Sequence, residues 1–156
     1  MIGMRMIETK NYQEMSRKAA GLIGGQVLLK PDCVLGLATG SSPIGTYDLL
    51  AKGCEEGLLD FSQVRTVNLD EYCGLKADDP QSYRYFMDTH LFDRVNINKE
   101  NTFLPSGTAP DMEAEAQRYE ALVRSMGGAD LQLLGIGHNG HIGFNEPADH
   151  FPAAVH

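Results

Sequence analysis

The segment from Gly135 to Pro147, GIGHNGHIGFNEP, places two histidines, an asparagine and a glutamate in one glycine-rich stretch. Its first six residues fit the G-x-G-x-x-G spacing of a dinucleotide-binding turn. That turn opens a helix, however, and Pro147 with the β-branched and aromatic residues before it disfavours one. His138, His141 and Glu146 also lack a known metal-ligand spacing. An imidazole oriented by a carboxylate is the usual arrangement for acid–base work near neutral pH, so we interpret His141 with Glu146 as a proton-transfer pair.

A second acidic stretch, VNLDEY, puts Asp70 and Glu71 side by side at the end of an apolar run. A carboxylate at the carboxyl end of a strand can be partly desolvated, which raises its pKa toward the range useful for proton transfer. The alternatives are a solvated acidic turn, or a local cap in which Asp70 accepts hydrogen bonds from nearby N–H groups. From these residues alone Asp70 is a candidate base, and both alternatives stay open.

A third stretch, LATGSSP, joins an apolar run to a region with helical periodicity. Gly40 would let a ligand approach the backbone closely, and Ser41 and Ser42 offer hydroxyls. The N–H groups of the first turn of the next helix could also point at an anion. This is not a P-loop, because no Gly-Lys-Ser/Thr follows. The alternative is an ordinary turn in which a serine caps the helix.

The spacing of apolar residues predicts the elements that position these stretches. Helical periodicity covers residues 11–29, 43 onward, 82–91 and 111–126. Short apolar runs predict strands at residues 5–9, 33–38, 64–69 and 131–137. This alternation predicts one α/β domain over residues 1–156: three layers, with a mainly parallel Rossmann-like sheet and helices on both faces. Ligands bind beyond the carboxyl ends of such strands, which is where all three stretches fall.

The bulk properties narrow the class of partner. A formal net charge of -8 over 156 residues disfavours non-specific binding to nucleic acid or to an anionic membrane. The three cysteines form no C-x-x-C pair, and their odd number argues against a disulfide framework. We find no signal-peptide pattern and no apolar run near the roughly 18 residues of a membrane helix. The sequence therefore predicts a reduced, cytoplasmic protein that binds a small molecule.

Taken together, the three stretches resemble the glucosamine-6-phosphate deaminase family. The resemblance is carried by LATGSSP, by TVNLDEYCGL with SYRYFM after it, and by GIGHNGHIGFNEPA, in this order and spacing. The sister family of 6-phosphogluconolactonases shares the fold, but usually shows DER for DEY and a TASLFP-like continuation after the GH loop. The resemblance implies a fold of the deaminase, ribose-phosphate isomerase and CoA-transferase kind. It also implies conversion of glucosamine 6-phosphate and water to fructose 6-phosphate and ammonia, with no metal or organic cofactor.

The resemblance also implies roles for individual residues. Asp70 would be the base that moves a proton between C1 and C2 of the opened sugar. His141 would open the ring by handling the protons of O5 and the C1 hydroxyl, and Glu146 and Asn139 would orient and tune it. The residues that would line the substrate are Thr39, Gly40, Ser41, Ser42, Gly137 and His138.

This chain departs from the family pattern at two points. Many members carry Asp at the position of Asn139, and an amide cannot hold an imidazolium by charge. We therefore expect Glu146 to supply most of that role, and Glu146→Gln to lower kcat more than Asn139→Ala. Members also continue well beyond this length, with a lysine and an arginine that grip the phosphate.

The difference in length leads to several expectations. We expect this chain to lack the C-terminal strands and helices of the domain. We also expect a monomer or small homo-oligomer without allosteric control. The alternative functions are a 6-phosphogluconolactonase-like sugar-phosphate hydrolase and a truncated, non-catalytic sugar-phosphate-binding relative.

Overall fold

The computed structural model describes residues 4–149 and 155. The elements in chain order are α1 (Tyr12–Leu29), β1 (Val34–Leu37), α2 (Ile44–Glu55), β2 (Arg65–Asn68), α3 (Tyr83–His90), β3 (Thr102–Phe103), α4 (Met112–Ser125) and β4 (Leu131–Gln132). Two short 3-10 turns, Phe92–Arg94 and Lys99–Asn101, lie between α3 and β3. The predicted domain, residues 1–156, includes residues 1–3, 150–154 and 156, which lie outside this description.

Side-chain caps determine where three of the helices begin. Asn11, Ser82 and Asp111 precede α1, α3 and α4, and each accepts a hydrogen bond from the backbone N–H three residues further on. Such caps satisfy N–H groups that have no partner inside the helix. The predicted bounds of these helices agree with the observed ones to within one residue. α2 begins after Pro43 without a side-chain cap, so the serine-capped alternative for the TGSSP turn does not form.

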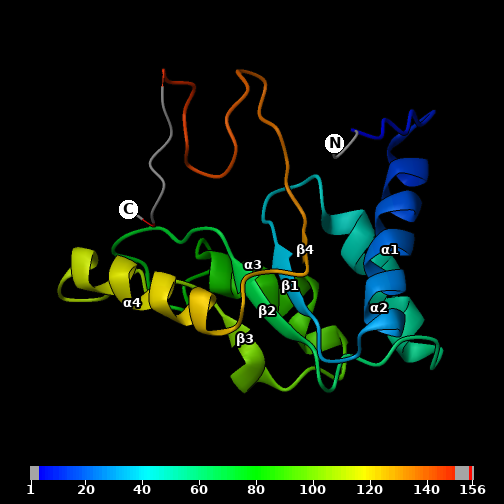
Figure 1. Ribbon diagram of the computed structural model, residues 1–156, viewed down its shortest axis with the longest axis horizontal. Helices are drawn as coiled ribbons and strands as arrows, with labels where there is room; N and C mark the ends of the chain where they lie inside the picture. Colours follow the sequence, from blue (N-terminus) through cyan, green and yellow to red (C-terminus); the bar gives the residue numbers. More distant parts are fainter. Residues whose placement is uncertain (1–3, 150–154, 156) are drawn as a thin grey trace.

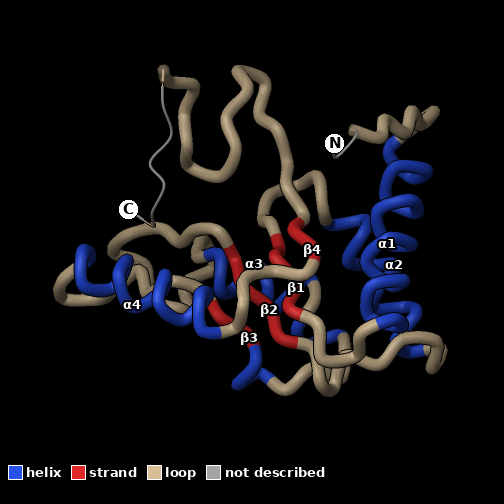
Figure 2. Tube along the Cα trace, in the orientation of Figure 1, coloured by secondary structure: helices blue, strands red, loops and turns tan. Residues whose placement is uncertain are grey.

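The four strands form a sheet of order β3-β2-β1-β4 in which every pairing is parallel. β1 lies inside the sheet between β2 and β4, and all four of its residues are buried. Figure 2 shows the strands gathered at the centre with helices around them. The predicted α/β fold with a parallel sheet is confirmed.

The strands differ from the prediction at three places. Residues 5–9 form no strand, because the apolar side chains there cover no sheet face: Met6 and Ile7 are 84% and 41% exposed. β3 is not predicted, since a strand of two residues has no visible periodicity. β4 ends at Gln132 rather than at residue 137, and residues 134–136 are exposed.

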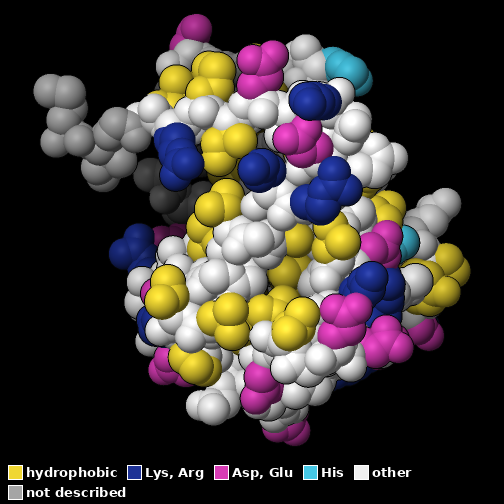
Figure 3. Space-filling view, turned by 90° about the vertical axis from the view of Figure 1, so that its right-hand side faces the viewer, with side chains coloured by type: hydrophobic (Ala, Val, Ile, Leu, Met, Phe, Trp, Pro, Cys, Tyr) yellow, Lys and Arg dark blue, Asp and Glu magenta, His cyan; other side chains and the backbone are white. Residues whose placement is uncertain are grey.

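The helices cover the two faces of the sheet unequally (Figure 1). α1, α2 and α3 pack with Leu35 and Leu37 of β1 around the main apolar core. α4 lies on the other face, where Leu122 and Phe103 line the same cavity. Figure 3 shows apolar side chains among charged ones on the side of the molecule that lies to the right in Figure 1. Leu28 and Leu29 of α1 are exposed.

The segments that follow the strands lie close enough to form a site. The segments that follow β1 and β4 leave the same edge of the sheet in Figure 1, as parallel pairing requires. The segment after β2 leaves that edge as well, because β2 is parallel to β1. Within residues 4–149, no helix combines the length and apolarity needed to cross a membrane.

Candidate active site

Asp70 lies two residues after the end of β2 and lines a cavity of about 590 Å³, whose lining also includes Cys73, Phe144 and Asn145. Burial raises the pKa of Asp70 to about 6, and repulsion from the Glu71 carboxylate adds to the rise. A hydrogen bond from the backbone N–H of Phe144 to the Asp70 carboxylate opposes the shift in pKa. A carboxylate of this kind is ionised at neutral pH but holds a proton more readily than a solvated one, which suits a base that must return its proton.

The neighbouring carboxylate has a different task. Glu71 accepts hydrogen bonds from the backbone N–H groups of Tyr83 at 2.8 Å and Arg84 at 2.9 Å, both in the first turn of α3. It also accepts one from the N–H of Tyr72 at 2.9 Å. The local cap that the sequence left open for Asp70 is therefore formed by Glu71, and this leaves the Asp70 carboxylate facing the cavity.

Three aromatic rings join the segments that follow the strands. The ring centroids of Tyr72 and Tyr83 lie 4.8 Å apart, and Phe144 lies 5.2 Å from the first and 5.7 Å from the second. The Tyr83 hydroxyl also contacts Thr39 and, at 3.3 Å, the hydroxyl of Tyr72. Burial raises the pKa of Tyr83, so its hydroxyl stays protonated at neutral pH. The segments after β1, β2 and β4 thus meet around Tyr83, a residue for which the sequence pattern predicts no role.

His141 is held through an amide rather than directly by a carboxylate. Its Nδ1 lies 2.7 Å from Asn139 Oδ1, and Asn139 Nδ2 donates to Glu146 Oε2 at 2.6 Å. Glu146 Oε1 is 3.9 Å from Nδ1 of His141. Because a carboxylate only accepts hydrogen bonds, Glu146 fixes the amide with its NH₂ outward and its oxygen toward the imidazole. The proton on His141 is then on Nδ1, which leaves Nε2 as the free basic nitrogen.

Two glycines of the same segment are required by close approach. An added Cβ at Gly137 would lie 2.2 Å from Cε1 of His141, so the imidazole rests on the bare backbone. An added Cβ at Gly143 would lie 2.9 Å from Oδ2 of Asp70, and its φ of +60° is a conformation that side chains disfavour. The backbone at Gly143 and Phe144 is therefore packed directly on the Asp70 carboxylate.

The TGSS segment is fixed by a residue of α1. The hydroxyl of Tyr12 donates to the carbonyl of Ser41 at 3.2 Å and accepts from the N–H of Gly45 at 2.8 Å. One N–H of the first turn of α2 is therefore engaged inside the protein, and is not free for an anion as predicted. Gly40 has a φ of +92° and, like Ser41 and Ser42, is exposed.

The structure brings the side chains of His141, Asn139 and Glu146 together, but of the predicted site residues Asp70 is the one that lines the larger cavity in the described part of the chain. Asp70 meets the segment after β4 at Gly143 and Phe144, while the hydrogen bonds of the His141 side chain go to Asn139. His138 is exposed. Within residues 4–149 and 155, no three histidine, cysteine, aspartate or glutamate side chains are placed to share a metal ion.

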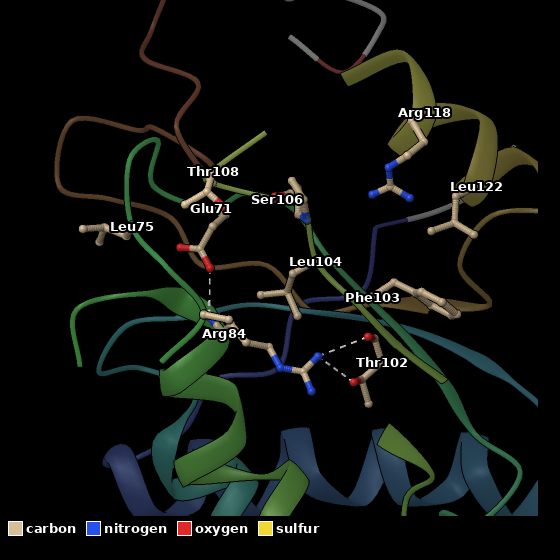
Figure 4. Close-up of a pocket in the computed structure, with 13 residues that line it drawn as sticks. Glu71, Leu75, Arg84, Thr102, Phe103, Leu104, Ser106, Thr108, Arg118 and Leu122 are labelled. Atoms are coloured by element: carbon tan, nitrogen blue, oxygen red, sulfur yellow. Dashed lines mark hydrogen bonds between the residues drawn. The ribbon is translucent and has the colours of Figure 1, made fainter. Parts of the chain in front are cut away.

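A smaller cavity of about 260 Å³ lies near Glu71 and contains two arginines (Figure 4). Arg84 pairs with Asp88 at 3.0 Å and reaches the Thr102 hydroxyl at 2.8 Å, and Arg118 pairs with Glu115 at 2.6 Å. Both guanidinium groups are thus neutralised by carboxylates of the chain. We therefore place the candidate active site in the larger cavity with Asp70.

Comparison with known proteins points to one family. The model of the glucosamine-6-phosphate isomerases/6-phosphogluconolactonase family matches residues 10–144. A glucosamine-6-phosphate deaminase of Lachnoclostridium phytofermentans is 59% identical over 153 residues, which are 98% of this chain and 65% of that protein. One from a Geobacillus species is 56% identical over 153 residues, 98% of this chain and 61% of that protein.

Solved structures give the same picture. A monomeric glucosamine-6-phosphate deaminase superposes with a TM-score of 0.90 at 49% identity, covering 92% of this chain and 60% of that one. The 6-phosphogluconolactonase of Thermotoga maritima gives a TM-score of 0.72 at 25% identity, covering 90% and 62%. The chain thus spans between 60% and 65% of the length of these four proteins.

Proposed function

This chain belongs to the glucosamine-6-phosphate isomerase/6-phosphogluconolactonase family, and we propose that it deaminates glucosamine 6-phosphate to fructose 6-phosphate. The observation that carries the proposal is the half-buried Asp70, whose pKa is raised to about 6 and which faces the larger cavity. Moving a proton between two carbons of a sugar requires such a base. The identity to deaminases supports this substrate class.

The first step in the proposed reaction opens the pyranose ring. Nε2 of His141 is free to accept the proton of the C1 hydroxyl and to deliver a proton to O5 as the C1–O5 bond breaks. The product is the open aldehyde with its amine on C2. Asn139 holds the imidazole in the required tautomer, and Glu146 holds Asn139 in the required orientation. The His141 side chain is 41% exposed, so a substrate can reach it.

The second step moves a proton from C2 to C1. Ionised Asp70 removes the C2 proton, the electron pair forms a C1–C2 double bond, and the aldehyde oxygen takes a proton from water to become the enol hydroxyl. Return of the proton to C1 leaves a C2 iminium, to which water adds. Loss of ammonia from C2 then gives the ketone of fructose 6-phosphate. Separate proton carriers are needed because the oxygen protons and the carbon proton lie at different atoms, and each carrier contributes about 10²–10⁴ in rate.

We assign the sugar end of the substrate to the TGSS segment. Thr39, Gly40 and Ser41 follow the central strand β1, and Tyr83 connects Thr39 to the segment that carries Asp70. Gly137 and His138 complete the proposed lining from the segment after β4. The reaction as written moves only protons, water and ammonia, so it calls on no metal or organic cofactor.

The setting of the enzyme is also part of the proposal. We infer a cytoplasmic protein, since its three cysteines are all unpaired and Cys73 is exposed. We infer a monomer or small homo-oligomer, supported by the similar enzyme that is monomeric. The net charge of -8 supports a small-molecule substrate over nucleic acid or a membrane surface.

The direct test is ammonia release from glucosamine 6-phosphate by this chain, with Asp70→Asn as the matched variant. Release by the wild type that disappears in Asp70→Asn supports the proposal, because the substitution keeps the size of the side chain and removes the base. No release by either protein refutes the proposal for this chain.

The second candidate is a lactonase, since the family model and one superposed structure include 6-phosphogluconolactonases. Hydrolysis of 6-phosphogluconolactone without ammonia release from the amino sugar would favour it. The sequences DEY at Asp70 and FNEP at Glu146 favour the deaminase, as the sister family usually differs at both places.

A further inference from the structure

We propose that Glu71 is a positioning residue of this site, whose carboxylate fastens the segment after β2 to the first turn of α3 and so places Asp70 and Tyr83 together. The inference rests on the proposed function and deepens it. Glu71 would touch neither the substrate nor the reacting atoms. It would act through the residues on either side of it and through its charge.

The first support is the number and direction of its hydrogen bonds. Oε1 of Glu71 accepts from the N–H of Tyr83 and Oε2 accepts from the N–H of Arg84 (Figure 4 shows the second). N–H groups at the start of a helix have no partner inside it, and the helix dipole favours a negative charge there. Ser82 caps only the N–H of Tyr85. The two caps are therefore complementary, and within residues 4–149 and 155 no other acceptor bonds to the N–H groups of the first two residues of α3.

The second support is what these bonds connect. The N–H groups that Glu71 binds belong to residues whose side chains reach two other parts of the site. The Tyr83 hydroxyl contacts Thr39 after β1, and the Arg84 guanidinium donates to the carbonyl and hydroxyl of Thr102 in β3. A shift of the first turn of α3 would therefore move the TGSS segment relative to Asp70. Glu71 is the one residue beside Asp70 on the chain that bonds to this turn.

The third support is charge. Glu71 puts a second carboxylate next to Asp70, and this raises the pKa of Asp70 beyond the effect of burial. Among the described groups, the N–H of Phe144 from the segment after β4 bonds to the Asp70 carboxylate, and the charge of Asp70 raises the pKa of the Tyr83 hydroxyl from α3 and of the Tyr119 hydroxyl from α4.

Charged side chains also line the cavity from α4. They are paired within α4: Glu115 with Arg118 at 2.6 Å, and Glu120 with Arg124 at 2.5 Å. Among the described groups around Asp70, Glu71 is the carboxylate whose partners are neutral N–H groups. Within the described residues its charge is therefore not balanced by an ion pair, although Arg84 and Arg118 line the same small cavity.

Two substitutions separate the two effects. Glu71→Gln keeps one side-chain oxygen as an acceptor and removes the charge. Glu71→Leu removes both. Glu56→Gln, at an exposed residue after the end of α2, is the matched control for loss of a glutamate charge elsewhere.

The decisive measurement follows the carboxyl carbon of Asp70 by NMR as a function of pH, because it needs no activity. We expect the Asp70 midpoint to fall in Glu71→Gln and to stay near the wild-type value in Glu56→Gln. An unchanged midpoint in Glu71→Gln would overturn the proposal. This readout tests Glu71 even where the chain releases no ammonia, so the failure of the proposed function would be seen separately.

The kinetic measurement tests positioning. We expect Glu71→Leu to lower kcat for ammonia release by roughly tenfold or more, because displacement of reacting groups by about 1 Å is costly. The acid limb of the pH–rate profile of Glu71→Gln should move to lower pH together with the Asp70 midpoint. A folded Glu71→Leu protein with wild-type kcat and KM would overturn the proposal as well.

Discussion

Gly137→Ala should displace the imidazole of His141 while leaving the stability of the fold close to that of the wild type. An added Cβ would lie 2.2 Å from Cε1, 2.4 Å from Nδ1 and 2.5 Å from Nε2 of the imidazole, whereas ordinary contact begins at 3.4 Å. The ring would therefore have to retreat by more than 1 Å. The ring can move because it is the end of a side chain. The substitution should therefore displace the imidazole rather than lower the stability of the fold.

The consequence for catalysis can be estimated from that displacement. A misplacement of about 1 Å in a reacting group can cost roughly 10²-fold in rate. Retreat of the ring would also stretch the 2.7 Å hydrogen bond from Nδ1 to Asn139 Oδ1, which fixes the tautomer. We expect kcat of Gly137→Ala to fall by about 10²-fold, with a melting temperature close to that of the wild type.

The same segment offers a matched control. An added Cβ at Gly135 would meet nothing within 4 Å. Gly135→Ala should thus keep the wild-type kcat in a steady-state ammonia assay, with thermal denaturation followed by circular dichroism for both variants. Wild-type kcat in Gly137→Ala, or an equal loss in Gly135→Ala, would refute the reasoning.

Four further expectations concern neighbouring groups. Because Asp70 must be ionised to act, kcat/KM should fall tenfold per pH unit below about pH 6, and an acid limb near pH 4 would contradict this role. Folding raises the pKa of Asp70 above its ordinary 3.8, so the free energy of unfolding should fall as pH rises from about 4 to 6. The melting temperature of Asp70→Asn should therefore exceed that of the wild type at pH 7 and equal it at pH 3. Asn139→Leu should lower kcat more than Glu146→Gln, because a glutamine oxygen can still accept from the amide while leucine frees His141; equal kcat losses would argue against the amide bridge. Tyr12→Phe should raise KM by about fivefold or more with kcat unchanged, since it removes two hydrogen bonds that contribute about 0.5–1.5 kcal/mol each. An unaltered KM would show that these two hydrogen bonds to the TGSS segment are dispensable.

The order for Asn139 and Glu146 reverses what the sequence predicted. From residue types alone, the charge of Glu146 was expected to hold the imidazole, which gave Glu146→Gln the larger loss. The structure places the amide in between, with the nearest carboxylate oxygen 3.9 Å from Nδ1. Which atom faces which depends on the fold of a loop, and spacing does not reveal it. Neither order is tested by the structure itself.

The elements were largely predictable because local signals set them. Asn11, Ser82 and Asp111 mark helix starts that follow from short-range capping. The central strand at Val34–Leu37 is a continuous apolar run, and the structure buries all of it. β3 could not be predicted, because pairing with β2 rather than any property of Thr102–Phe103 makes it a strand.

The sequence also could not predict which of Asp70 and Glu71 caps a helix and which faces the cavity. Asp70 and Glu71 are chemically equivalent on paper, and either could cap a helix or serve as a base. Their hydrogen-bond partners in the fold distinguish them. α3 begins 12 residues after Glu71, and the N–H groups of its first turn donate to the Glu71 carboxylate. Tyr12 was likewise missed, because its contact to Ser41 spans 29 residues.

The packing of Phe144 against Tyr72 and Tyr83 has a practical consequence for observing the loop. The chain contains no tryptophan, so tyrosine dominates its ultraviolet fluorescence. Phe144→Trp would place a lone indole beside two tyrosine rings whose centroids lie 5.2 and 5.7 Å from the present phenyl ring. Tyrosine-to-indole energy transfer would then be strong with the loop docked and weak with it released. The aromatic contact would thus report the docking of residue 144 against Tyr72 and Tyr83 as an optical signal that needs neither a label nor a coupled enzyme.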